Sequence, residues 1–218
     1  MGREIVDALK ASKKLKLVAE VARSHSGKQP GKYKKLDDIP KKPDVVIDFS
    51  LPAGFRVCAK YCEKNSVRLV SGTTGLTKAD QTKLSNLAKK TPVLWASNMS
   101  LGIATVRKMI EALNILGEAD IFLEDYHHKM KLDSPSGTAV TLAEDVKRVT
   151  GKKIDVQSVR AGKIYGIHRI VAVTDQEVVS IEHTALNRAV FAQGAVKAAE
   201  WIVSQRKKGL YQLSDVIS

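Results

Sequence analysis

The chain has 218 residues, of which 44% are hydrophobic and 27% charged, a composition typical of a globular protein with a sizeable core. Its net charge of +13 favours anionic ligands, but the basic residues are scattered in pairs, which argues against nucleic-acid binding. There is no apolar run near the roughly 20 residues of a membrane span, and the opening MGREIVDALK is no signal peptide, so we expect a cytoplasmic protein without membrane contact.

The first half of the chain alternates between two apolar patterns. Helices are predicted over 2–11, 52–65 and 77–90, and strands over 15–22, 43–50, 67–72 and 92–97. Strands that alternate with helices indicate βαβ units, a parallel sheet and right-handed crossovers, which together make a doubly wound α/β fold. Ligands of such sheets bind beyond the carboxyl ends of the strands.

The pattern changes after residue 100. The sequence predicts a long helix over 101–117, a strand over 119–128, a helix over 138–150 with Gly151 as its C′ residue, strands over 153–161, 168–175 and 177–185, and a last helix at about 189–207. The last two strands read as a hairpin. This half therefore predicts an α+β domain with an antiparallel or mixed sheet.

Two segments carry side chains suited to ligand binding. In SGTTGL (71–76), Gly72 and Gly75 allow close approach of the backbone to a ligand, and two threonine hydroxyls can hydrogen-bond to it, although a simple βα turn has the same composition. In HHKMK (127–131), histidines that transfer protons and lysines that carry charge directly precede SPSGTA (134–139), which is typical of a helix start. The N–H groups of that helix favour an anion, so the second segment predicts a carboxylate-binding, proton-donating site.

A metal site is the alternative interpretation of the second segment, because His127 and His128 are both possible ligands. Adjacent histidines on an extended segment point to opposite sides, and lysine is a poor companion for a cation. Cys58 and Cys62 have no further cysteine partners and are predicted to be reduced residues on a helix. We therefore predict no metal.

EDYHHKMKLDSPSGTA (124–139) resembles the signature of the dihydrodipicolinate reductase family. Other motifs of that family follow in the same order along nearly the whole chain: Asp48-Phe49-Ser50, Gly72-Thr73-Thr74-Gly75, Asn98-Met99-Ser100-Leu101-Gly102, then Arg160, Gly162, Gly166 and His168, and finally Arg188, Phe191, Ala192, Gly194 and Ala195.

The resemblance implies NAD(P)H-dependent reduction of 4-hydroxy-tetrahydrodipicolinate, a small cyclic dicarboxylate, in the diaminopimelate route to lysine. It implies a Rossmann-like dinucleotide-binding domain (1–98 plus 188–218), a substrate-binding and tetramerisation domain (99–187), and a homotetramer. His127 matches the catalytic proton donor and Lys131 the second catalytic cation. The other matched contacts are His128, Lys131, Ser136, Gly137 and Thr138 for the substrate, and Gly72, Thr73, Thr74, Ala96, Ser97, Asn98, Met99 and Arg188 for the cofactor.

The sequence departs from the family at its start, since Met1-Gly2-Arg3 falls inside the glycine-rich phosphate loop. We expect a sheet without its first strand and weakened cofactor binding, with Gly2 and Arg3 as remaining phosphate contacts. Met99 stands where the family often has an aromatic residue. Arg23 follows the second predicted strand, where an arginine accommodates the 2′-phosphate of NADPH, so we predict NADPH in preference to NADH.

Two alternatives stay open. Another NADP-dependent oxidoreductase on the same architecture, such as a semialdehyde dehydrogenase, requires a cysteine near its substrate, whereas Cys58 and Cys62 lie on a helix of the nucleotide half. A shortened, non-catalytic binding protein that retains the 127–138 loop is the second alternative.

Overall fold

The computed structural model describes residues 1–25 and 29–217, which form two compact units. Unit 1 comprises Met1–Met99 and Phe191–Val216, and unit 2 comprises Ser100–Val190 and Ile217. Each unit has a sheet and a hydrophobic core of its own. Among the described residues, no helix has the length and apolar character needed to cross a membrane.

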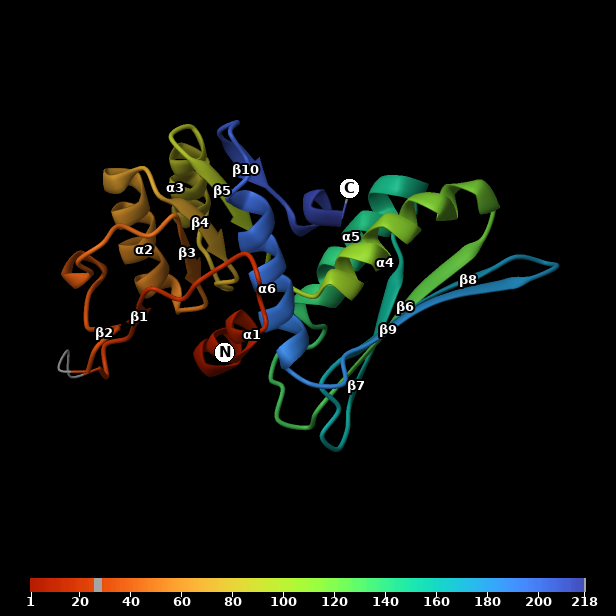
Figure 1. The fold of residues 1–218 in the computed structure, drawn as a ribbon. Helices are drawn as coiled ribbons and strands as arrows, with labels where there is room; N and C mark the ends of the chain where they lie inside the picture. Colours follow the sequence, from red (N-terminus) through yellow and green to blue (C-terminus); the bar gives the residue numbers. More distant parts are fainter. Residues whose placement is uncertain (26–28, 218) are drawn as a thin grey trace. The chain divides into compact units, whose positions relative to one another are not determined.

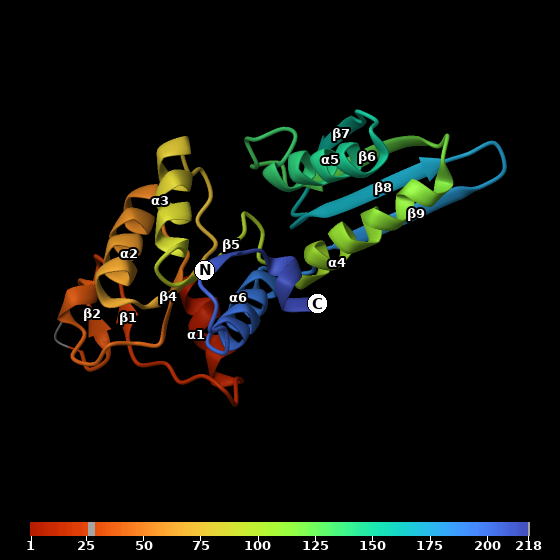
Figure 2. The same cartoon turned by 90° about the horizontal axis from the view of Figure 1, so that it is seen from above.

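The main sheet of unit 1 has four parallel strands in the order β10-β5-β4-β3. Helices cover both of its faces, with α2 and α3 on one side and α6 beside α1 on the other (Figures 1 and 2). The elements are α1 (Gly2–Lys10), β3 (Val45–Asp48), α2 (Pro52–Asn65), β4 (Arg68–Ser71), α3 (Lys78–Ala88), β5 (Pro92–Trp95), α6 (Ala189–Ile202) and β10 (Gly209–Tyr211). The predicted α/β class is confirmed.

Helix α2 illustrates how the core of unit 1 forms. Pro52 starts the helix, where its missing N–H is not needed. Phe55, Ala59 and Cys62 are spaced four and three residues apart, so they share one face of the helix, and all three are buried. They belong to the same core cluster as Leu84 of α3.

The strand predicted over 15–22 is wrong for most of its length. Only β1 (Glu20–Val21) is a strand, and it pairs with β2 (Lys32–Tyr33) in a separate two-stranded parallel sheet. Leu17 and Val18 are 40% and 49% exposed. Within the described ranges, β1 pairs only with β2 and β3 only with β4. An extended apolar run becomes a strand only where a neighbouring strand forms backbone hydrogen bonds with it. Residues 15–19 have no such neighbouring strand within the described ranges.

Unit 2 has a mixed sheet in the order β7-β6-β8-β9, as predicted. Strand β6 (Asp120–His127) pairs in parallel with β7 (Asp155–Arg160) and antiparallel with β8 (Ile167–Val173), which forms the predicted hairpin with β9 (Val178–Thr184). Helices α4 (Leu101–Ile110) and α5 (Gly137–Thr150) pack on one face of this sheet (Figure 2). Ile110, Leu123 and Leu142 are fully buried between them.

Two predicted helices end early. The helix expected over 101–117 is α-helical to Ile110 and continues as the 3₁₀ helix η2 (Glu111–Leu116). The last helix ends at Ile202 instead of 207, because the side chains of Ser204 and Gln205 bond to the carbonyl of Trp201. Strand β10 and the short helices η1 (Leu36–Asp38) and η3 (Leu213–Ile217) were not predicted.

Candidate active site

The carboxyl ends of β3, β4 and β5 lie side by side in unit 1. The register pairs Asp48 with Ser71 and Ser71 with Trp95, so the segments that follow these residues leave the sheet at one edge. The predicted cofactor contacts at 72–74 and 96–99 therefore lie together, as the alternation of strands and helices indicates.

Asp48 organises this edge. Its buried carboxylate accepts hydrogen bonds from the hydroxyls of Ser50 (2.6 Å), Ser71 (2.9 Å) and Thr73 (2.8 Å). The expectation that both threonine hydroxyls face a ligand is therefore corrected. Thr74 is exposed, whereas the hydroxyl of Thr73 is bonded within the protein, and only its backbone is left for a ligand.

Gly72 has a steric reason to be glycine. A Cβ at this position would lie 2.7 Å from the ring of Phe49, so the backbone of 72–74 runs directly over that ring. Packing against Phe49 therefore requires this glycine, and a glycine at the end of a parallel strand also suits the close backbone approach that a dinucleotide needs.

The other predicted cofactor residues lie in several places. Gly2 and Arg3 form the exposed first turn of α1, whose N-cap Met1 makes no side-chain capping bond, so its N–H groups suit a phosphate. Arg23 is exposed just after β1, and Met99 is buried at the end of unit 1. Arg188 is exposed just before α6 and belongs to unit 2.

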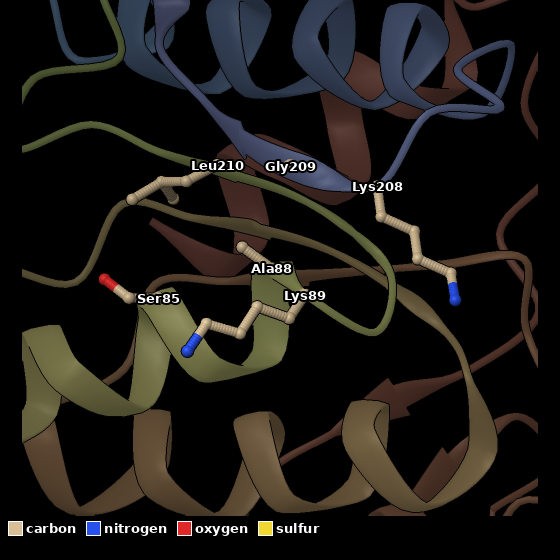
Figure 3. Close-up of a pocket in the computed structure, with 6 residues that line it drawn as sticks. All are labelled: Ser85, Ala88, Lys89, Lys208, Gly209 and Leu210. Carbon is tan, nitrogen blue, oxygen red and sulfur yellow. The ribbon is translucent and has the colours of Figure 1, made fainter.

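A shallow hollow of unit 1 lies between α3 and β10 (Figure 3). Lys89 and Lys208 flank it, and Ser85, Ala88, Gly209 and Leu210 complete its lining. None of the predicted site residues is among these six, so the hollow is separate from the predicted cofactor contacts.

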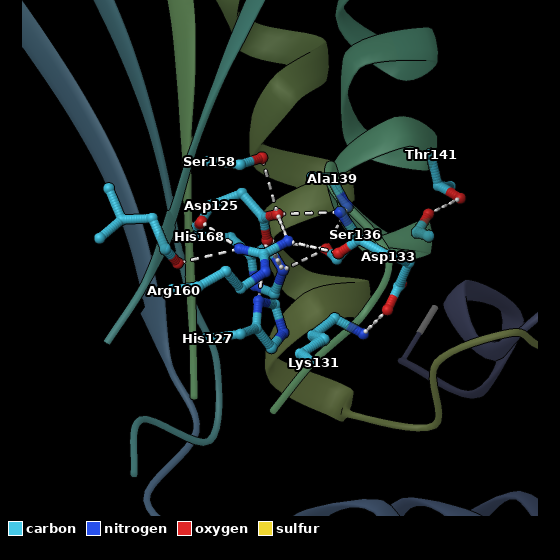
Figure 4. Close-up of polar contacts among 12 residues, drawn as sticks. Asp125, His127, Lys131, Asp133, Ser136, Ala139, Thr141, Ser158, Arg160 and His168 are labelled. Atoms are coloured by element: carbon cyan, nitrogen blue, oxygen red, sulfur yellow. Dashed lines mark hydrogen bonds and ion pairs between the residues drawn. The ribbon is translucent and has the colours of Figure 1, made fainter. Parts of the chain in front are cut away.

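In unit 2, the predicted substrate residues gather between the end of β6 and the start of α5 (Figure 4). Ser136 is the N-cap of α5: its hydroxyl accepts from the N–H of Ala139 (3.1 Å) and donates to Asp125 (2.8 Å). Ser136 is 1% exposed, so its side chain supports the site from within. Gly137 and Thr138 present the first turn of the helix more openly.

Lys131 already holds a carboxylate in this structure. Its Nζ lies 2.8 Å from Oδ1 of Asp133. Partial burial would raise the pKa of Asp133, but the hydrogen bonds from Lys131 and from the N–H of Gly137 outweigh it and lower the pKa. Lys131 and the first turn of α5 thus stabilise the negative charge of Asp133, while a substrate carboxylate at this position stays a prediction.

His127 is the last residue of β6 and is buried. Its Nδ1 lies 3.0 Å from Oδ1 of Asp125, although the ring N–H is not aligned for a well-formed hydrogen bond. On the other side of the ring, a Cβ at Gly166 would lie 3.0 Å from Nε2. His128 is more exposed than His127, so the two histidines have different surroundings.

Asp125 is the residue of this site that the sequence analysis missed. It is fully buried, and Ser136, Ser158 and Arg160 all donate to its carboxylate. Burial alone would raise the pKa of Asp125, but the contacts from His127, His168 and Ser136 hold it well below its usual range. Asp125 lies inside the signature 124–139, two residues before His127, but the sequence does not show that Arg160 and His168 contact its carboxylate.

Asp125, His127 and His168 place possible metal-ligand atoms within 4.8 Å of one another. The carboxylate, however, already receives the Arg160 guanidinium (2.9 Å) and the Ser136 N–H (2.8 Å) on one oxygen. A cation would have to displace a positively charged donor. These donors suit an anionic environment better than a metal ion, so the absence of a metal remains our prediction.

The two units together define a class of protein. A parallel sheet with a glycine turn at its strand ends is typical of pyridine-nucleotide binding, and a histidine beside a lysine at a helix N-terminus is suited to protonating a carboxylate substrate. These are the features of a two-domain, pyridine-nucleotide-dependent oxidoreductase.

Comparisons with known proteins identify the family. The sequence-family model for the N-terminus of dihydrodipicolinate reductase matches residues 1–99, and the family model for its C-terminus matches residues 102–217. The 4-hydroxy-tetrahydrodipicolinate reductase of Bdellovibrio bacteriovorus is 40% identical over 218 residues, which cover 100% of this chain and 91% of the relative. The enzyme of the same name from Campylobacter curvus is 39% identical over 242 residues, with 100% and 94% covered. The chain belongs to the dihydrodipicolinate reductase family.

A solved structure agrees on the fold. The dipicolinate-bound dihydrodipicolinate reductase from Paenisporosarcina sp. TG-14 superposes with a TM-score of 0.81 at 24% identity, covering 97% of this chain and 92% of the other. The predicted Rossmann-like fold with a second mixed-sheet domain is therefore confirmed.

Proposed function

We propose that this chain reduces 4-hydroxy-tetrahydrodipicolinate to tetrahydrodipicolinate with NAD(P)H, in the diaminopimelate route to lysine. The main support from the geometry is the carboxylate position between Lys131 and the first turn of α5, with His127 beside it (Figure 4). The names of the curated relatives state the same activity for those proteins.

Different residues of unit 2 bind the substrate and transfer the proton. Lys131 and the N–H groups of Gly137 and Thr138 bind a substrate carboxylate, with His128 as a further contact. When bound at the strand ends of unit 1, NAD(P)H would supply the hydride that the substrate ring accepts. His127 donates the proton to the atom where negative charge develops. Overall, one hydride and one proton are consumed and one water is released.

In unit 1, the proposed cofactor contacts surround the carboxyl ends of β3, β4 and β5. They are Gly72, the backbone of Thr73, Thr74 and residues 96–99, with Gly2 and Arg3 as proposed phosphate contacts. Arg188, which belongs to unit 2, is a further proposed cofactor contact. Arg23 carries the proposed preference for NADPH over NADH, because a guanidinium binds a 2′-phosphate well. Replacing Arg23 by Gln should lower kcat/KM for NADPH and leave that for NADH unchanged. A wild-type kcat/KM that is higher with NADH contradicts the preference.

A homotetramer is part of the proposal, with unit 2 supplying the interface. The face of its sheet opposite α4 and α5 carries Phe122 and Val171 opposite each other, and Val178 is 62% exposed. Arg169 pairs with Glu124 across the same face (2.6 Å). Such a surface suits burial against a second copy. Light scattering should give the mass of four chains, and a monomeric mass would contradict this part.

We also propose a cytoplasmic location, where NADPH is supplied.

The function is tested by following the loss of reduced nicotinamide after adding substrate freshly made by the preceding synthase. We expect one NADPH consumed per substrate, and binding of both NADPH and pyridine-2,6-dicarboxylate in titrations. Binding of the dicarboxylate without turnover would support a non-catalytic binding protein instead.

A further inference from the structure

One motif of the sequence has no role in the proposed chemistry: Arg160, Gly166 and His168 of the stretch 160–168. In the structure all three lie around His127 or its partner Asp125. Gly166 faces Nε2 of His127, and the rings of His127 and His168 meet edge to face with centroids 5.3 Å apart. Arg160 reaches Asp125 from the adjacent strand β7 (Figure 4).

The carboxylate of Asp125 joins these groups to the start of α5, and its two oxygens have different partners. Oδ1 lies near side chains that bear on proton transfer: His127 Nδ1 (3.0 Å), Ser136 Oγ (2.8 Å) and His168 Nε2 (3.4 Å). Oδ2 receives one backbone donor, Ser136 N (2.8 Å), and two side-chain donors, Arg160 (2.9 Å) and Ser158 Oγ (3.2 Å).

We propose that Asp125 is the positioning residue of this site, which orients His127 with one carboxylate oxygen and the first turn of α5 with the other. Arg160 and His168 keep the carboxylate in place. This inference rests on the proposed function, because it concerns the proton donor and the carboxylate position of that reaction.

Asp125 also determines which nitrogen of His127 exchanges a proton. A carboxylate only accepts, so we infer that Nδ1 of His127, 3.0 Å from Oδ1 of Asp125, carries hydrogen and that Nε2 is the nitrogen that exchanges the proton. Gly166 lies beside this nitrogen, and an alanine methyl there would lie 3.0 Å from it, so the glycine leaves the most room next to Nε2. The glycine and the aspartate therefore act on opposite sides of one ring.

Arg160 connects the same carboxylate to the substrate loop. Its guanidinium donates to the backbone carbonyl of Asp125 (3.0 Å) and to that of Asp133 (2.6 Å). Asp133 precedes Ser136 by three residues and pairs with Lys131. Thus Asp125 and Arg160 together fix both ends of the segment that carries the two proposed catalytic groups.

The test is the pH profile of Asp125→Asn with the full chain, NADPH and substrate. The charged and titratable groups that face His127 are Asp125 on its own strand, Arg160 on β7, His168 on β8, and Lys131 and Asp133 in the loop. Without the carboxylate, the protonated imidazole is less stabilised. We expect kcat to fall about 10- to 100-fold and the basic limb of its profile to move to lower pH.

The matched control is Asp145→Asn. Asp145 is also nearly buried and pairs with Arg107, but it lies on α5 away from the loop. We expect lower stability from this variant and an unchanged pH profile. In a His127→Gln background, Asp125→Asn should lower kcat little further, because a positioning residue acts through the group it positions.

Several outcomes overturn the proposal. One is a folded Asp125→Asn variant with kcat within about twofold of wild type and an unmoved profile; another is an equal loss of kcat with and without His127. If Asp125→Asn does not fold, Asp125→Glu replaces it, and wild-type kcat in that variant counts against the proposal. A wild-type chain that does not turn over would overturn the proposed function instead, so the two failures are distinguishable.

Discussion

Replacing Lys131 by glutamine removes the charge that we propose to bind a substrate carboxylate. The Lys131 side chain is 23% exposed and its partner Asp133 is 55% exposed, so their contact is only partly shielded from water. A hydrogen bond to a charged group contributes about 1.5–3 kcal/mol, which corresponds to about 10- to 150-fold in affinity. Lys131 must break its ion pair with Asp133 when a ligand binds, so we expect a loss of affinity at the lower end of this range.

The assay is calorimetric titration of pyridine-2,6-dicarboxylate into the NADPH-loaded chain. Lys129→Gln is the matched control, because it makes the same change of charge two positions away on an exposed side chain. We expect Kd to rise about tenfold for Lys131→Gln and less than about twofold for Lys129→Gln. An equal effect of both variants would refute a specific contact and indicate a diffuse positive surface.

Three further predictions follow from single residues. Asp133→Asn should tighten dicarboxylate binding several-fold in the same titration, because the carboxylate that competes for Lys131 is gone; weaker binding would contradict this. Burial raises the pKa of Cys62 to about 12 and that of Cys58 further, so native protein should react slowly with iodoacetamide at pH 8, and fast labelling would contradict the buried positions. The pKa of Asp125 is lower in the folded chain, so its stabilisation is present above about pH 4 and lost as pH falls below it. The urea midpoint of wild type should therefore drop more steeply below pH 4 than that of Asp125→Asn, and parallel curves would contradict this.

The sequence predicted the elements whose apolar period is long and regular. Helix α2 has the predicted bounds, and the βα alternation predicted the parallel sheet. The prediction from sequence failed where strand pairing, rather than the apolar pattern, determines the secondary structure. Residues 15–19 are as apolar as a strand but have no partner strand among the described residues, whereas the three residues of β10 become a strand because β5 is beside them.

The candidate site was predicted to a similar extent. The motif at 127–138 placed His127, Lys131 and the helix N-terminus together, since they are close in sequence. It could not show that the hydroxyls of Thr73 and Ser136 are bonded to buried aspartates. Thr73 lies 25 positions from its partner aspartate and Ser136 lies 11 positions from its own. Both contacts depend on how the elements pack together, which the spacing of apolar residues does not encode.

The central claim is that His127 donates the proton while the surrounding residues bind the diacid. The most direct measurement compares steady-state kcat and KM of His127→Gln and His128→Gln with NADPH and freshly made substrate. We predict that His127→Gln lowers kcat at least about 100-fold with little change in KM, whereas His128→Gln mainly raises KM. A His127→Gln variant with near wild-type kcat would contradict the account.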